Sequence, residues 1–157
     1  MKLKKKILSG LFTGFVAIQL IQPTHNKTDK ILPTDFKKIN AVPDQVLDVL
    51  ENSCYDCHSN NTRYPWYSFI QPAAWWMASH IRKGKGNLNF SDFGAYSNRK
   101  QQGKLQAIIN SINDKTMPLN SYTMLHKNAR LSAENKEVLL DWIKATKDSL
   151  SQKNEIQ

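Results

Sequence analysis

Cys54-Tyr55-Asp56-Cys57-His58 is the stretch of this 157-residue sequence that decides its fold. It contains both cysteines of the chain, three residues apart, with a histidine directly after the second. Shuffling the same composition would give this arrangement roughly three times in ten thousand. The pattern therefore indicates a specific chemical use of two thiols and one imidazole.

The spacing suits the covalent attachment of one haem. Two thiols three residues apart can reach two vinyl groups on neighbouring pyrrole rings, and the next residue then presents its imidazole to the iron. We expect Cys54 and Cys57 to form the thioether bonds of a single haem c and His58 to be an axial ligand of its iron.

Three other interpretations of the cysteine pair stay open. A structural zinc site would need His80 or His126 as further ligands, and adjacent Cys57 and His58 are poorly placed to bind one ion together. A thioredoxin-like redox pair would need a strand-helix-strand context, which the sequence lacks. A plain disulfide is the ordinary use of two cysteines in an exported protein.

The first 21 residues have the build of an export signal. Residues 1–6 are basic, and residues 7–21 carry no charge. No small-residue cleavage site follows, which favours an uncleaved membrane anchor over a removed signal peptide, although the apolar stretch is short for a span of about 20 residues. The lysines at its start predict that the body lies on the periplasmic face of the cytoplasmic membrane.

The rest of the chain is expected to be all-α, because no alternating pattern is long enough to predict a sheet. Residues 22–41 are polar and predict a linker, residues 42–146 the haem-binding domain, and residues 147–157 a frayed polar tail. Helical patterns begin at Pro43, near Pro72, near residue 97 and at Ser132. We expect Gly84 and Gly86 to end the second of these helices.

The second axial ligand of the iron is expected to be Met117. This residue follows an amphipathic helix and precedes Pro118, outside regular structure, where a loop can turn the sulfur towards the iron. His80 is the alternative, and it would lower the redox potential. His126 or Met124 could also substitute, and an open sixth site is a further possibility.

Aromatic side chains crowd the sequence after the cysteine motif. Such rings can cover a porphyrin and exclude water, although ordinary core packing explains them equally well. Tyr122 and Arg63 are also candidates for contact with a propionate. The expected haem-pocket residues are Tyr64, Trp66, Trp75, Trp76 and Tyr122.

Three segments, residues 54–67, 71–76 and 117–123, resemble the small haem-binding domain family of c-type cytochromes common in Bacteroidetes. The resemblance covers about residues 41–145. It implies a mainly helical domain, similar to class I cytochrome c, that binds one haem and is often anchored to a membrane.

The function expected from these features is electron transfer by a membrane-tethered, periplasmic monohaem cytochrome, with membrane or periplasmic redox proteins as partners. It is not an enzyme in this interpretation, because no nucleophile, carboxylate pair or distal acid-base pair is evident. The alternative is a haem-based sensor or ligand-binding module with an open or displaceable sixth site. A nucleic-acid partner is not expected: without the four N-terminal lysines, 18 basic residues oppose 13 acidic ones, and they are scattered.

Overall fold

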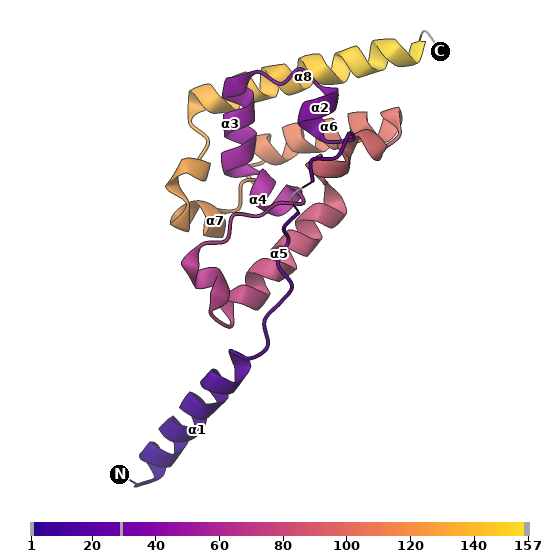
Figure 1. Ribbon diagram of the computed structural model, residues 1–157. Coiled ribbons are helices and arrows are strands. Elements are labelled where there is room, and N and C mark those ends of the chain that lie inside the picture. Colours follow the sequence, from indigo (N-terminus) through magenta and orange to yellow (C-terminus); the bar gives the residue numbers. More distant parts are fainter. Residues whose placement is uncertain (1, 29, 156–157) are drawn as a thin grey trace.

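The computed structural model describes residues 2–28 and 30–155, which form helices joined by turns and loops (Figure 1). No strand occurs among the described residues, so the all-α prediction is confirmed. The α-helices are α1 (Lys2–Ile18), α2 (Phe36–Ile39), α3 (Asp44–Ser53), α4 (Tyr55–His58), α5 (Ala73–Asn87), α6 (Asn98–Asn113), α7 (Asn120–Leu125) and α8 (Ala133–Glu155). Three 3-10 helices join them: η1 (Trp66–Phe69), η2 (Phe90–Ala95) and η3 (Lys127–Ala129).

The hydrophobic core lies where α6 packs along α8 and α8 meets α3. Helix α6 buries Leu105, Ile109 and Ile112, which follow one another on a single helical face. Helix α8 contributes Leu139 and Ile143, both almost completely buried. Burying side chains of this size stabilises the fold by about 1.5–3 kcal/mol each.

Helix α8 begins where the sequence predicts and ends later than expected. The Ser132 hydroxyl accepts a hydrogen bond from the Asn135 backbone N–H at 3.0 Å, which is the geometry of an N-cap. The helix then continues to Glu155 instead of fraying at Lys147. The Lys147 ammonium donates to Gln106 Oε1 of α6 at 2.6 Å, so contacts with α6 stabilise the last turns. Residues 156 and 157 of the predicted tail lie outside the described residues.

The segment expected to be a polar linker is packed against the domain. Asp35 caps α2 by accepting a hydrogen bond from the Lys37 N–H at 3.1 Å. Phe36, only 1% exposed, then lies edge-on to Phe93 and Trp142, with ring centroids 4.8 and 5.6 Å away. A single large aromatic ring in an otherwise polar stretch therefore anchors this segment in the core.

Asn26 ties the same segment to the loop that follows the cysteine motif. Its Nδ2 donates to the Ser59 carbonyl at 2.8 Å and to Thr62 Oγ1 at 2.9 Å, and its Oδ1 accepts from Lys85 Nζ at 2.6 Å. Its backbone N–H donates to the Tyr64 hydroxyl at 2.6 Å. Polar side chains here make specific internal hydrogen bonds, which composition alone does not distinguish from the solvated side chains of a linker.

Helix α1 points away from the remaining helices and buries none of its residues (Figure 1). Among the described residues, no helix is long and apolar enough to cross a membrane. The helix has 17 residues, and lysines take four of its first five positions. The anchor expected from the sequence therefore lacks support in this helix.

Replacing Phe36 by alanine tests whether residues 22–41 belong to the folded domain. We expect Phe36→Ala to lower the free energy of unfolding by about 3–5 kcal/mol, because it removes a buried ring from a packed core. Phe12→Ala is the matched control, since Phe12 is 68% exposed and the change should stay within about 0.5 kcal/mol. Urea unfolding measures both, and equal values for the two variants would show that the segment is a free linker.

Candidate haem site

The cysteine motif occupies the junction between α3 and α4. Helix α3 ends at Cys54, whose backbone has left the helical conformation, and its carbonyl starts the next turn by accepting from the N–H groups of Cys57 (3.2 Å) and His58 (3.0 Å). This single turn brings Cys54, Cys57 and His58 to the wall of one cavity of about 210 Å³. The structure thus brings the three predicted motif residues together.

A second cavity, of about 350 Å³, is bounded by some of the same residues. Cys54, His58 and Met117 line both cavities, which makes the two spaces neighbours. The second space is walled mainly by apolar side chains from α6 and the loops around it: Leu88, Phe90, Ala107, Ile108, Ile112 and Leu131. Apolar walls of this kind, beside two thiols and an imidazole, fit a porphyrin.

His58 is oriented by the backbone in the way that metal-binding histidines usually are. Its Nδ1 lies 3.0 Å from the Leu88 carbonyl oxygen, which can only accept, so Nδ1 carries the proton. The lone pair is then on Nε2, the nitrogen left available to a metal. Burial lowers the pKa of His58, partly opposed by backbone hydrogen bonding at Leu88 and Gly84, and so favours the neutral imidazole that a metal needs.

Both cysteines are free thiols, and their surroundings keep them protonated. Burial raises the pKa of Cys54 to about 12 and that of Cys57 to about 11, with smaller effects from the neighbouring Cys57 and Asp56 charges. A thioredoxin-like pair needs the opposite shift, since its attacking cysteine must be a thiolate at neutral pH. The raised pKa values of Cys54 and Cys57 therefore do not favour a thioredoxin-like redox pair.

The zinc interpretation also lacks its ligand set. Among the residues that the structure describes, no group of three or more His, Cys, Asp or Glu side chains is arranged to hold a metal ion. A haem iron differs because the porphyrin supplies four of its ligands, so the protein needs to provide only the axial ones.

Helix α5 approaches the motif closely, and Gly84 makes this approach possible. A Cβ atom at Gly84 would lie 2.6 Å from the carbonyl oxygen of Cys57 and 3.3 Å from its Cβ. Contrary to the expectation from sequence, neither Gly84 nor Gly86 ends the helix, which runs to Asn87. Gly84 is required because two backbones meet there, a role that the sequence alone did not reveal.

The candidates for the sixth ligand are placed very differently. Met117 lines both cavities, and His80 lines the first cavity with its Nδ1 already bonded to the Trp76 carbonyl at 2.9 Å. His126 uses both ring nitrogens, with the Tyr122 carbonyl at 3.1 Å and the Tyr67 hydroxyl at 3.3 Å. Two further methionines line neither cavity: Met77, which is buried, and Met124, which is 72% exposed.

Of the five aromatic residues expected in the haem pocket, Tyr122 lines the first cavity. The other four line neither cavity. Trp66 is largely exposed, Trp75 donates to the Ile21 carbonyl at 3.1 Å, and Trp76 packs on His80. The Tyr64 hydroxyl is held by Asn26, as described above.

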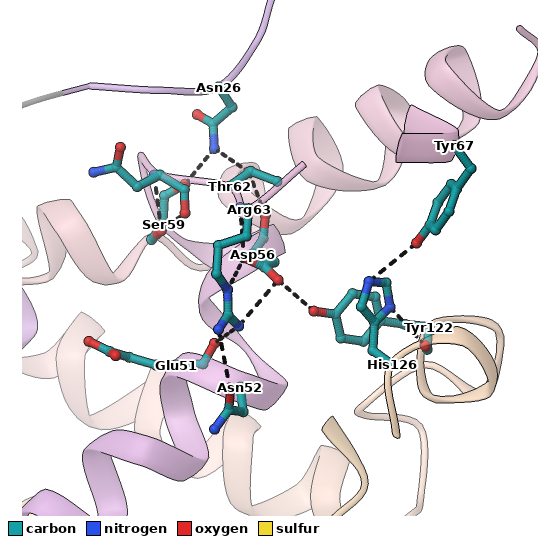
Figure 2. A network of polar contacts seen from close by, with 11 residues as sticks. Asn26, Glu51, Asn52, Asp56, Ser59, Thr62, Arg63, Tyr67, Tyr122 and His126 are labelled. Carbon is teal, nitrogen blue, oxygen red and sulfur yellow. Dashed lines mark hydrogen bonds and ion pairs between the residues drawn. The ribbon is translucent and has the colours of Figure 1, made fainter. Parts of the chain in front are cut away.

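Asp56, the second residue between the two cysteines, is a buried carboxylate at the centre of a polar network that the sequence did not indicate (Figure 2). Its Oδ1 accepts from the Arg63 backbone N–H at 2.9 Å and from Arg63 Nε at 3.1 Å. Its Oδ2 accepts from the Tyr122 hydroxyl at 2.6 Å. Arg63 and Tyr122, proposed from sequence as contacts for a propionate, are thus both engaged by Asp56.

The geometry leads to a comparison with known protein families. Residues 13–145 match the model of a family described as a haem-binding domain. The chain belongs to the haem-binding domain family. No curated protein and no solved structure matches it significantly. Membership makes haem the cofactor of this haem-binding domain, which agrees with the oriented imidazole of His58 and the apolar cavity beside it.

Substituting Gly84 tests whether close helix approach holds the attachment motif. We expect Gly84→Ala to destabilise the domain by about 1–3 kcal/mol and to lower haem incorporation, because the new methyl group would push α4 away from α5. Gly86→Ala, two residues on and with nothing within 4 Å, is the control. It should stabilise α5 by about 0.5–1 kcal/mol. Thermal unfolding and haem content measure both, and the same stabilisation in the two variants would contradict the assigned role.

Proposed function

We propose that this domain holds one haem c covalently through Cys54 and Cys57, with His58 and Met117 as axial ligands, and that it transfers single electrons. The iron would supply the redox chemistry by changing its oxidation state by one electron. The observation that carries the proposal is that His58 and Met117 line the same two neighbouring cavities with Cys54.

The chain's own residues support this assignment in three ways. The Leu88 carbonyl holds the protonated Nδ1 of His58, which leaves Nε2 unprotonated and available to a metal. The protonated thiols of Cys54 and Cys57 lie on one turn beside it. Cationic side chains border both spaces, Lys83 the first and Lys104 the second, and they suit the two carboxylates of haem.

A purely electron-transferring role needs no general acid or base. The carboxylate found among the described residues that line the first cavity is Asp56, and Arg63 and Tyr122 already engage it. We therefore propose no enzymatic activity. The redox partners would be membrane or periplasmic proteins, and the scattered basic residues do not favour a nucleic-acid partner.

A haem-based ligand-binding or sensor module is the second candidate. Met117 is 39% exposed, and α7, which follows it, buries no residue. A methionine on so lightly packed a segment is easier to displace by a diatomic ligand than one fixed in a core. The two functions therefore differ in how firmly Met117 is held.

Absorption spectra of the protein produced with the haem-attachment machinery test the assignment. We expect the wild type to retain haem after denaturation, to show a methionine–iron charge-transfer band when oxidised, and to bind carbon monoxide poorly when reduced. Met117→Ala should lose the band and bind carbon monoxide readily. His80→Ala and the exposed control Met124→Ala should behave like the wild type.

Each deviation from this pattern has a defined meaning. Absence of covalently retained haem in the wild type would refute haem attachment by Cys54 and Cys57. Ready binding of carbon monoxide by His80→Ala instead of Met117→Ala would assign the sixth position to His80. Ready binding of carbon monoxide by the wild type would favour the sensor function.

We further propose that residues 1–21 direct the chain across the cytoplasmic membrane and retain it at the periplasmic face. The support is the basic start followed by an uncharged stretch without a cleavage site. Fractionation followed by intact-mass measurement tests this. We expect full-length, haem-containing protein in the membrane fraction, whereas a soluble periplasmic form lacking the first residues would show that the segment is a cleaved signal peptide.

A further inference from the structure

The loop that carries Met117 is held at one end by local backbone contacts. The N–H groups of Thr116 and Met117 both donate to the Ser111 carbonyl, at 3.0 and 3.2 Å. These bonds connect the loop to the end of α6, the helix that precedes it. They do not connect the loop to α4, which carries the cysteine motif.

The other end of the loop runs into α7, and apolar packing does not fix this helix. Helix α7 has six residues, none of which is buried. A helix of this length is unstable by itself. Its position relative to the motif must therefore depend on specific side-chain contacts.

The strongest such contact is the hydrogen bond from the Tyr122 hydroxyl to Asp56 Oδ2, at 2.6 Å (Figure 2). Tyr122 lies on α7, five residues after Met117, and Asp56 lies on α4 between the two cysteines. Both residues line the first cavity together with Met117. The bond thus connects the methionine loop directly to the turn that bears the attachment residues.

Asp56 is a fixed acceptor and not a mobile surface carboxylate. It is 5% exposed, and Arg63 holds its other oxygen through two N–H groups. The Asp56 backbone carbonyl also accepts from Thr62 Oγ1 at 2.6 Å. Arg63 thus holds the carboxylate, also donating from Nη2 to Oδ2 at 3.3 Å, and Thr62 holds the backbone of the same residue. An acceptor fixed in this way can define the position of the Tyr122 hydroxyl.

A second set of contacts, around His126, also helps to hold α7 in place. The Tyr122 ring stacks on His126, with centroids 4.1 Å apart and the planes inclined by 20°. His126 in turn pairs its Nε2 with the Tyr67 hydroxyl at 3.3 Å. The stacking holds two residues of the segment after Met117 together, and the bond to Tyr67 connects that segment to η1.

From this geometry we infer that Asp56 is a positioning residue, which acts through Tyr122 to hold the Met117 loop against the haem site. The inference rests on the proposed role of Met117 and deepens it, because it names what keeps the sulfur in place. Asp56 and Tyr122 need not touch the iron. They set the fraction of time for which Met117 occupies its position.

Tyr122→Phe is the direct test, because it removes the donor hydroxyl and keeps the ring that stacks on His126. Loss of a hydrogen bond to an ionised group corresponds to about a tenfold change in an equilibrium constant. We expect the reduced variant to bind carbon monoxide about tenfold more tightly than the wild type, with unchanged covalent haem content and a weaker methionine–iron band. Asp56→Asn, which keeps one acceptor oxygen, should give a smaller change in the same direction.

Tyr64→Phe is the matched control, since the Tyr64 hydroxyl bonds Asn26 and lines neither haem cavity. It should leave the carbon monoxide affinity unchanged. Hydrogen exchange of the haem-free chains provides a readout independent of the cofactor. The amides of residues 117–126 should exchange about tenfold faster in Tyr122→Phe and at the wild-type rate in Tyr64→Phe.

The outcomes separate this inference from the proposed function. If Met117→Ala binds carbon monoxide readily but Tyr122→Phe matches the wild type in affinity and exchange, the positioning role of Asp56 is overturned and Met117 stands as the ligand. If Met117→Ala itself matches the wild type, the assigned sixth ligand fails and the inference fails with it. Faster exchange of residues 117–126 confined to Tyr122→Phe and Asp56→Asn supports the inference.

Discussion

The motif of residues 54–58 sits on one helical turn, and a single turn does not hold its shape without help from its surroundings. Helix α4 has four residues, from Tyr55 to His58, and three contacts from other elements fix it. The Gly84 backbone of α5 meets Cys57, the Leu88 carbonyl orients His58, and the Arg63 side chain engages Asp56. Every other property of the site depends on these contacts, because they determine where two thiols and one imidazole point.

Those features of the fold that arise from neighbouring residues could be predicted from the sequence. The apolar spacing of Leu105, Ile109 and Ile112 predicts α6, and the hydroxyl of Ser132 predicts the start of α8. The cysteine motif predicts a haem because the spacing itself carries the chemistry. Each of these signals is complete within a window of a few residues, so no knowledge of the tertiary structure is needed to recognise it.

The features that were not predictable depend on residues far apart in the chain. The sequence predicts that Gly84 ends its helix, whereas its role in the structure arises because the Cys57 carbonyl oxygen lies 2.6 Å from where a Cβ atom would be. The sequence alone does not distinguish Asp56 from a solvent-exposed carboxylate. Its hydrogen bonds with Arg63 and Tyr122 exist only in the folded chain. Phe36 stands alone in a polar stretch, and its burial depends on Phe93 and Trp142.

Three tryptophans were predicted to line the haem pocket, and they line neither cavity. Trp66, Trp75 and Trp76 lie close to the motif in sequence, which made them natural candidates for the haem pocket. The structure instead leaves Trp66 largely exposed, packs Trp76 on His80, and lets Trp75 donate to the Ile21 carbonyl. Sequence proximity to a site therefore says little about side-chain direction once a turn intervenes.

His58 and Met117, on the two sides of the candidate haem site, are held by their surroundings to different degrees. His58 lies on α4, which packs against α3 and α5, and the Leu88 carbonyl fixes its ring. The Met117 side is a loop followed by α7, which buries nothing and is tied down chiefly by Tyr122 and His126. A substitution on the first side therefore affects whether the domain folds around a haem. If Met117 is the sixth ligand as proposed, a substitution on the second side would change how often it occupies that position, and so would shift the domain between the proposed electron transfer and ligand binding.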